Sequence, residues 1–261
     1  MKNVPTVRDV AALIEELAPL DLRADWDNVG LQLGEESTPV RKALVTLTVT
    51  PDIAALAAAE GVQLIVAHHP LIFRPLRQIR TDTPQGALVA SLLRHGTAVY
   101  VSHTNLDSAA YGLNHWLAER LELGNPRPLV PGLSPGTGLG RVGRIQPMSA
   151  ADFAAFVGRK LQTPVRLIGQ GSQMCAAAAV CGGSGGSLIE AARAAGAHVL
   201  VTGDVSYHDA LEALDAGLAV IDAGHHGTEK IMVPKLAEYL RSRLAGQLEV
   251  LEAPSLDPFA G

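Results

Sequence analysis

The sequence has few cysteines, no long apolar run and no leader-like N-terminus. Its 261 residues include two cysteines, Cys175 and Cys181, whose spacing matches no common zinc or redox motif, so we interpret both as buried thiols. Disulfide bonds and thiolate zinc sites are therefore not expected. No segment approaches the ~20 consecutive apolar residues that span a bilayer. The first ten residues lack the apolar core of a signal peptide, and we expect a cytoplasmic protein without membrane contact.

Positive charge is also scarce. The 21 basic and 26 acidic side chains give a formal net charge of −5. Proteins that bind nucleic acid through many phosphate contacts carry an excess of Lys and Arg, so a nucleic-acid partner is not expected, although a local cationic pocket is compatible with this count. Apolar residues make up 48% of the chain and the mean hydropathy is +0.19, which is enough for a full core and for some burial between subunits.

Two common catalytic or binding motifs are missing. No Gly-x-Ser-x-Gly segment occurs, and neither cysteine has a local catalytic partner, so covalent nucleophilic catalysis has no support. The glycine-rich segment 182–186 lacks the Lys and Ser/Thr of a phosphate-binding Walker loop. We interpret it as a tight structural turn, with an anion-binding loop as the alternative.

Short apolar runs alternate with helical patterns, which predicts an α/β fold with mixed or parallel sheets. Thr6 and Asp9 resemble a capping box that opens a helix over 7–18. The other expected helices are 51–60, 83–95, 108–121, 150–161, 186–195, 206–216 and 227–244. The expected strands are 43–50, 62–66, 97–102, 141–146, 164–169, 175–181, 198–202, 218–222 and 248–252.

A stretch rich in Gly and Pro, residues 123–140, predicts a domain boundary, because neither a helix nor an interior strand persists through so many of these residues. We therefore expect a two-part protein. Residues 1–123 and 186–261 would form one α/β domain from both ends of the chain, and residues 124–185 would form a smaller inserted α/β unit.

Histidines follow the second predicted strand, at the kind of strand end where parallel α/β sheets usually carry their sites. His68 and His69 come directly after the strand and before Pro70. Neighbouring side chains on a strand point to opposite faces, so both histidines serve one site only if the chain turns there. The alternative is one structural and one solvent-exposed histidine.

Two other strand ends carry carboxylates. Asp107 follows the strand 97–102 and is either a ligand or the cap of the next helix. His225 and Glu229 follow the strand 218–222 with a separation of four, which lets both face one cavity or form an exposed pair.

Taken together, these positions predict a metal site in the larger domain. Imidazole and carboxylate groups suit zinc, iron or manganese, and the donor types leave the choice among these ions open. Five ligands exceed what one tetrahedral ion needs, so we expect two divalent ions. Three neutral imidazoles and two carboxylates carry a charge of −2, and two divalent ions carry +4. The pocket would therefore keep a charge of +2 and attract phosphate or hydroxide. Hydrolysis by a metal-bound hydroxide is the expected chemistry.

Six motifs in this order resemble the Nif-three-like family, some members of which carry the name GTP cyclohydrolase 1 type 2 homolog. The motifs are WDNVGLQLG at 26–34, AHHP at 67–70, SHTNLD at 102–107, GGSG at 182–185, GD…YH at 203–208 and GHHGTE at 224–229. The resemblance extends over residues 5–252, and the length is similar to that of compact members without a long central insertion.

The resemblance implies a dinuclear metal site with the same five ligands, His68, His69, Asp107, His225 and Glu229. It also implies a ring-shaped homohexamer whose metal sites face an internal cavity, and a cyclohydrolase-type reaction on a nucleotide-like substrate. Two other functions stay open. One is a metal-binding hexameric scaffold or interaction protein with little turnover, and the other is a bimetal phosphoesterase, since the same ions serve both reactions.

Several further residues are weaker candidates. We consider His103 and Glu229 catalytic, with His103 moving a proton or orienting a substrate phosphate; the alternative for His103 is a supporting hydrogen bond. His226 stands beside His225 and is either a ligand in its place or a substrate contact. Asn28 and His208 are candidate substrate contacts, with a turn residue and a solvated helix residue as the respective alternatives.

Overall fold

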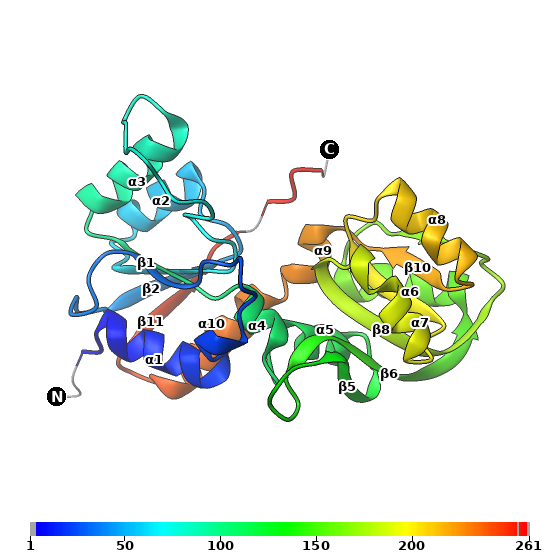
Figure 1. The fold of residues 1–261 in the computed structure, drawn as a ribbon. Coiled ribbons are helices and arrows are strands. Elements are labelled where there is room, and N and C mark those ends of the chain that lie inside the picture. Colours follow the sequence, from blue (N-terminus) through cyan, green and yellow to red (C-terminus); the bar gives the residue numbers. More distant parts are fainter. Residues whose placement is uncertain (1–3, 255, 260–261) are drawn as a thin grey trace. The chain divides into compact units, whose positions relative to one another are not determined.

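The computed structural model describes residues 4–254 and 256–259, and the chain divides into two compact units. Unit 1 takes residues up to 106 together with 232–255, and unit 2 takes residues 107–231 together with those from 256 onward. Each unit has one mixed sheet covered by helices, which confirms the expected α/β fold (Figure 1). Among the described residues, no helix has the length and apolar character needed to cross a membrane.

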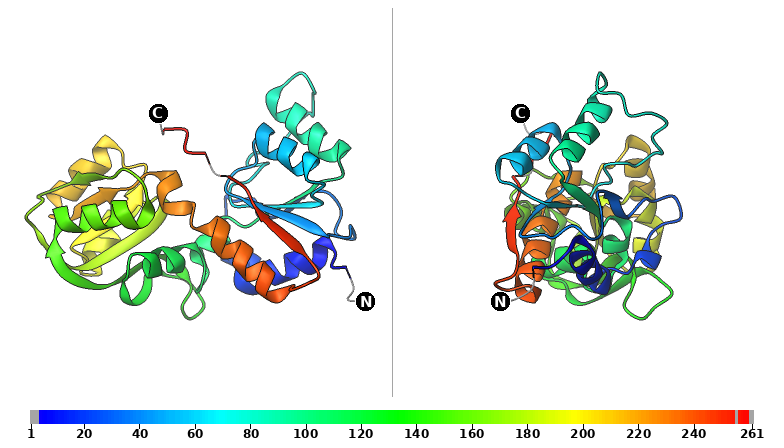
Figure 2. Two further views of the ribbon diagram at one scale, coloured as in Figure 1. Left: turned by 180° about the vertical axis from the view of Figure 1, so that it is seen from behind. Right: turned by 90° about the vertical axis from the view of Figure 1, so that its left-hand side faces the viewer.

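The sheet of unit 1 has the order β1-β4-β3-β2-β11, with β1 antiparallel to β4 and the other strands parallel. Its strands are β1 (Gly30–Leu33), β2 (Lys42–Thr46), β3 (Leu64–Ala67), β4 (Ala98–Val101) and β11 (Glu249–Glu252). Figure 2 shows β11, in red, beside β2. The strand β1 was not expected from the sequence.

Helices cover both faces of this sheet (Figure 1). They are α1 (Val7–Leu17), η1 (Leu20–Leu22), α2 (Pro51–Ala59), α3 (Pro84–Arg94), α4 (Thr104–Ser108, which crosses into unit 2) and α10 (Met232–Arg243). The capping box of Thr6 and Asp9 forms as expected. Side chains of α2 and α3 pack on Leu44, Ile65 and Val99. Because β3 and β4 are parallel neighbours, their carboxyl ends meet at one edge of the sheet.

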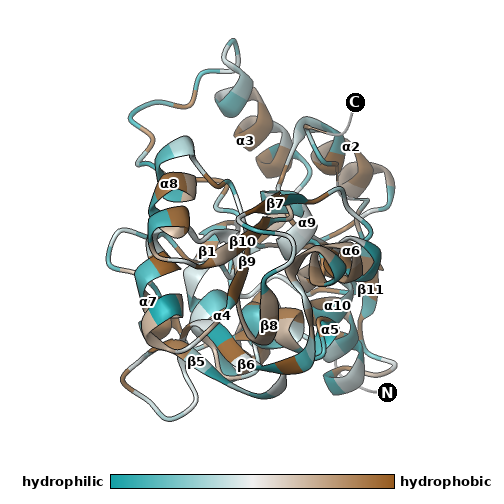
Figure 3. Ribbon diagram, turned by 90° about the vertical axis from the view of Figure 1, so that its right-hand side faces the viewer, coloured by the Kyte–Doolittle hydropathy of each residue, from teal (hydrophilic) through white to brown (hydrophobic). Residues whose placement is uncertain are grey.

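The sheet of unit 2 has the order β5-β6-β8-β9-β10-β7. Its strands are β5 (Gly124–Pro131), β6 (Gly138–Ser149), β7 (Arg166–Ile168), β8 (Met174–Ser184), β9 (Val199–Gly203) and β10 (Ala219–Asp222). Its helices are α5 (Leu113–Arg120), α6 (Ala150–Leu161), η2 (Gly186–Leu188), α7 (Ile189–Ala194), α8 (Tyr207–Asp215) and α9 (His225–Glu229). Helices α5 and α6 pack on one face and α7 and α8 on the other. The neighbouring strands β9 and β10 are largely hydrophobic (Figure 3) and are buried over most of their length.

The division of the chain differs from the one expected. The proline-rich segment is not a linker but the edge strand β5, where missing N–H groups are tolerated. Strand β9 pairs in parallel with β8, so the residues after 185 continue the same sheet. Unit 2 therefore extends from 107 to 231 instead of ending at residue 185.

Two helices also begin or end elsewhere than expected. The helix expected over 108–121 begins at Leu113, after the short helix α4. The helix expected over 227–244 is divided into α9 and α10 at Lys230 and Ile231. Apolar periodicity predicts helical segments well but does not show where a helix is interrupted.

A buried arginine holds the segment after α4 in unit 2. Arg141 on β6 is almost fully buried, and its guanidinium donates to the carbonyls of Gly138, Gly140, Ala109 and Ala110 at 2.5–3.2 Å. Burial lowers its pKa to about 10, so it stays charged at neutral pH. These bonds tie the residues that follow Asp107 to the sheet.

We predict that Arg141→Met destabilises the protein by about 3 kcal/mol or more, because it removes a charged donor that serves four carbonyls at a buried position. Arg144→Met is the matched control, since Arg144 lies on the same strand and is exposed. The midpoint of urea unfolding measures the difference. Equal midpoints for the two variants would contradict the structural role of Arg141.

Candidate metal centre

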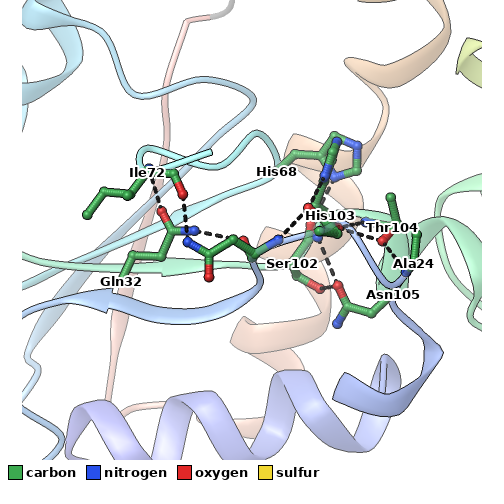
Figure 4. A network of polar contacts seen from close by, with 10 residues as sticks. Ala24, Gln32, His68, Ile72, Ser102, His103, Thr104 and Asn105 are labelled. Carbon is green, nitrogen blue, oxygen red and sulfur yellow. Dashed lines mark hydrogen bonds and ion pairs between the residues drawn. The ribbon is translucent and has the colours of Figure 1, made fainter. Parts of the chain in front are cut away.

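The chain turns directly after β3, and His68 is buried at this turn. Its Nδ1 atom lies 2.9 Å from the carbonyl oxygen of Ser102, at the end of the neighbouring strand β4 (Figure 4). A carbonyl oxygen only accepts, so Nδ1 carries the proton. The lone pair of His68 is therefore on Nε2, which is buried. Metal-binding histidines are commonly fixed in this way.

His69 follows at the same turn and faces the same cluster. Its Nδ1 atom lies 2.7 Å from the hydroxyl oxygen of Thr48, which follows β2. The two imidazole rings are tilted, with centroids 5.2 Å apart. The expected condition for a shared site, a turn at this position, is thus met.

His103 is held by a carboxylate. Its Nδ1 atom lies 2.9 Å from Oδ1 of Asp27, and the same carboxylate accepts from the backbone N–H of Asn28 and from both the N–H and the hydroxyl of Thr104. Burial alone would raise the pKa of Asp27, but the hydrogen bonds from His103 and Thr104 together outweigh burial and lower this pKa to about 2. Asp27 is therefore ionised at neutral pH, and it orients His103 with Nδ1 protonated.

These three histidines of unit 1 form one cluster. Each offers a ring nitrogen, and the three nitrogens lie within 4.8 Å of one another, close enough to hold a metal ion. The ring of His103 lies edge-on to those of His68 and His69, at centroid distances of 5.1 and 5.8 Å. His103, assigned to proton transfer from the sequence, is thus also placed to act as a ligand.

A second cluster lies in unit 2, at the ends of β9 and β10. His225 begins α9, where its Nδ1 atom lies 2.7 Å from Oδ2 of Asp204 and its Nε2 atom lies 2.9 Å from Oε2 of the buried Glu229. The hydrogen bond to Glu229, opposed by burial and reinforced by Asp204, raises the pKa of His225 to about 9. In the metal-free protein a proton therefore sits between two groups that are both good metal ligands.

The glycine-rich segment gives Glu229 its space. Gly183 has a positive φ of 63°, and a Cβ atom there would clash with Oε1 of Glu229. The backbone N–H of Gly183 donates to the hydroxyl of Thr228, and that of Gly182 donates to Asn114. Two of its amides are thus bonded within the protein, which supports the structural interpretation of this segment.

Asp107 belongs to the same region of unit 2. It lies in α4 rather than capping α5, whose N-cap is Gly112. The buried side chain of Asn114 donates to its backbone carbonyl at 3.0 Å. The side-chain oxygen of Asn114 accepts from the N–H of Gly182, next to Gly183. Burial raises the pKa of the Cys181 thiol, and the charges of Asp107 and Glu229 raise it further. Cys181 stays protonated and, like Cys175, is buried and free, as expected.

The weaker candidates have other surroundings. The side-chain amide of Asn28 donates to the carbonyl of Ile72 at 2.6 Å, so it holds a loop. His208 is exposed on α8 beside the ring of Tyr207. His226 is half-buried, and its Nδ1 atom lies 3.8 Å from Asp257. Their roles as substrate contacts stay predictions.

Sequence reasoning missed the residues that orient the histidines. Asp204 belongs to a quoted motif but received no role, although a carboxylate at a strand end is a usable signal. Its φ of +54° is unusual for a residue other than glycine. Asp27 belongs to another of these motifs, WDNVGLQLG, and likewise received no role. The hydrogen bond between His68 and the backbone carbonyl of Ser102 could not be predicted from the residue type, because every residue has a backbone carbonyl.

Comparison with known proteins identifies the family. The model of Duf34/NIF3 (NGG1p interacting factor 3) matches residues 5–258. The chain belongs to this family. The resemblance seen in the motifs is thereby confirmed.

Two relatives of this NIF3-family chain are named GTP cyclohydrolase 1 type 2 homolog. The one from Lactococcus lactis is 38% identical over 240 residues, covering 90% of this chain and 91% of the relative. The one from Streptococcus pneumoniae is 34% identical over 247 residues, covering 89% of each. Among solved structures, a Bacillus cereus protein related to NIF3 superposes with a TM-score of 0.94 at 25% identity and full coverage of both chains.

The donor chemistry fits divalent metal ions. In His68 and His103, Nδ1 is tied to an oxygen that only accepts, so each ring offers Nε2. In His225, Asp204 holds Nδ1, and Nε2 faces Glu229, so this ring must release the proton at Nε2 before it binds a metal ion. The carboxylates and imidazoles in the two clusters are the ligand types that zinc, iron and manganese accept. Carboxylate or carbonyl partners behind ligand histidines fix the ring and raise its basicity.

We predict that Asp204→Asn weakens metal binding about 10- to 100-fold, because His225 loses the carboxylate that orients it. Glu190→Gln, which alters an exposed ion pair with Arg193 in the same unit, is the control and should bind metal normally. Competition with a chromophoric chelator measures both affinities. Identical affinities for the two variants would show that Asp204 has no part in metal binding.

Proposed function

We propose that the protein is a metal-dependent hydrolase that acts on a nucleotide-like substrate, with two divalent ions held by His68, His69, Asp107, His225 and Glu229. The observation that carries the proposal is the orientation of His68 and His225, whose Nδ1 atoms are both bonded to acceptors. The nucleotide-like substrate follows the name GTP cyclohydrolase 1 type 2 homolog that its relatives bear. The homohexamer stays a prediction, which the mass of the protein in solution tests.

The bound ions would supply positive charge that acidifies water and stabilises negative charge on oxygen. His103 is not one of the five assigned ligands, so we assign it to proton transfer. Its Nε2 accepts a proton from the attacking water and returns it to the leaving group. Asp27 stays ionised and stabilises the imidazolium formed between these two steps.

Charge balance favours an anionic substrate. Two carboxylates and neutral imidazoles only partly compensate two divalent ions, so the loaded site keeps a positive charge although the whole chain is at −5. Phosphate groups of a nucleotide suit such a site. The proposal therefore combines a phosphate-bearing substrate with hydrolysis.

We predict that Glu229→Gln removes both metal and turnover, because an amide oxygen is a far weaker metal ligand than a carboxylate oxygen. Glu229 is buried beside His225, and glutamine has nearly the same shape. Elemental analysis of the purified protein and hydrolysis of GTP are the two measurements. Glu212→Gln, at an exposed position of α8, is the control and should keep both.

Full metal content in Glu229→Gln would contradict the ligand assignment. Hydrolysis of a simple phosphoester, without any hydrolysis of the purine ring of GTP, would indicate a phosphoesterase. Metal binding without turnover of any nucleotide or phosphoester, together with a protein partner that binds even without metal, would indicate a scaffold.

A further inference from the structure

Two aromatic side chains of unit 1 are exposed beside the histidine cluster. Trp26 is 62% exposed and Phe73 is 48% exposed. The two rings lie edge to face, with centroids 5.9 Å apart and planes at 66°. Trp26 also lies edge to face with His103, at 6.2 Å and 74°. An edge-to-face pair leaves ring faces uncovered that a parallel stack would cover.

This pair is held in place rather than loosely displayed. The side-chain amide of Asn28 donates to the carbonyl of Ile72. The side-chain oxygen of Gln32 accepts from the N–H of the same residue (Figure 4). Gln32 also donates to the carbonyl of Asn28. The residue before Phe73 is thus fixed from both sides, and Trp26 precedes the anchored Asp27. Large exposed rings on a fixed backbone have little conformational freedom left to lose when a ligand binds.

The loop that carries Phe73 is also basic. Arg74 and Arg77 follow it directly and are exposed, whereas Arg80 is paired with Asp82. In a chain with a net charge of −5, this local positive charge beside exposed rings suits a ligand that has both an aromatic ring and phosphates.

We propose that Trp26 and Phe73 form the subsite for the planar heteroaromatic ring of a nucleotide, placing that ring against His103. The inference rests on the proposed function and deepens it, because it names the part of the chain that would recognise the base. Any base can stack on the face of an aromatic ring, so this subsite would contribute affinity and position the base. Polar groups that contact the edge of the base would provide base specificity.

The chain contains a built-in reporter for this contact. It has two tryptophans, and Trp116 is buried in α5. In Trp116→Phe the remaining tryptophan fluorescence comes from Trp26. We expect GTP to quench it saturably, whereas ribose 5-phosphate and inorganic tripolyphosphate, which have no aromatic ring, should leave it unchanged. If Trp116→Phe folds poorly, 5-fluorotryptophan in the unaltered chain gives the same signal by fluorine NMR, with Trp26→Phe assigning the resonance.

Variants at Trp26 separate stacking from simple packing. Trp26→Ala should weaken GTP binding about 5- to 150-fold, the range for loss of one base-stacking contact. Trp26→Phe should retain most of the affinity because it keeps an aromatic face, whereas Trp26→Leu should not. Tyr111→Ala is the matched control, since Tyr111 is a 68% exposed ring lying edge to face with His115 in unit 2. It should bind GTP normally.

The outcomes distinguish this subsite from the proposed function. Normal metal content and GTP hydrolysis with an unresponsive Trp26 would overturn the subsite and leave the hydrolase standing. Saturable quenching that is lost in Trp26→Ala, without hydrolysis, would support the subsite and count against the hydrolase. A change in the mass of the assembly in Trp26→Ala, with GTP affinity unaltered, would show that the ring pair contacts another subunit and would overturn the proposal.

Discussion

The candidate metal centre depends on one constraint, which is that His68, His103 and His225 are each held at Nδ1 by an acceptor oxygen. Ser102, Asp27 and Asp204 accept the Nδ1 protons of His68, His103 and His225. An imidazole that rotates freely offers either nitrogen and binds a cation weakly, because orientation must be fixed on binding. Here the hydrogen bonds within each unit provide that orientation before any ion arrives.

The fold supplies these partners through its strand ends. In unit 1, the parallel strands β3 and β4 bring His68 next to the carbonyl of Ser102. In unit 2, the parallel strands β9 and β10 do the same for Asp204 and His225. Strand ends that are neighbours in space are distant in the chain, so one sheet edge can gather groups from several loops.

Sequence reasoning predicted most helices and strands and several site residues, but it missed the edge strand β5 and the carboxylates that orient the histidines. Alternating apolar and helical patterns located most elements, and strand-end positions led to His68, His225 and Glu229. The proline-rich edge strand β5 was taken for a boundary, since composition does not distinguish a loop from an edge strand. The orienting carboxylates were not assigned because they lie 76 and 21 residues from the histidines they hold. Only the folded sheet brings these pairs together.

The family model matches residues 5–258, which include the segments that carry both clusters. X-ray absorption spectroscopy of the zinc-loaded protein tests the ligand set most directly. We predict nitrogen and oxygen neighbours at about 2.0–2.2 Å with scattering from imidazole rings and no sulfur. A sulfur shell at about 2.3 Å, or an oxygen shell without imidazole scattering, would contradict the assignment.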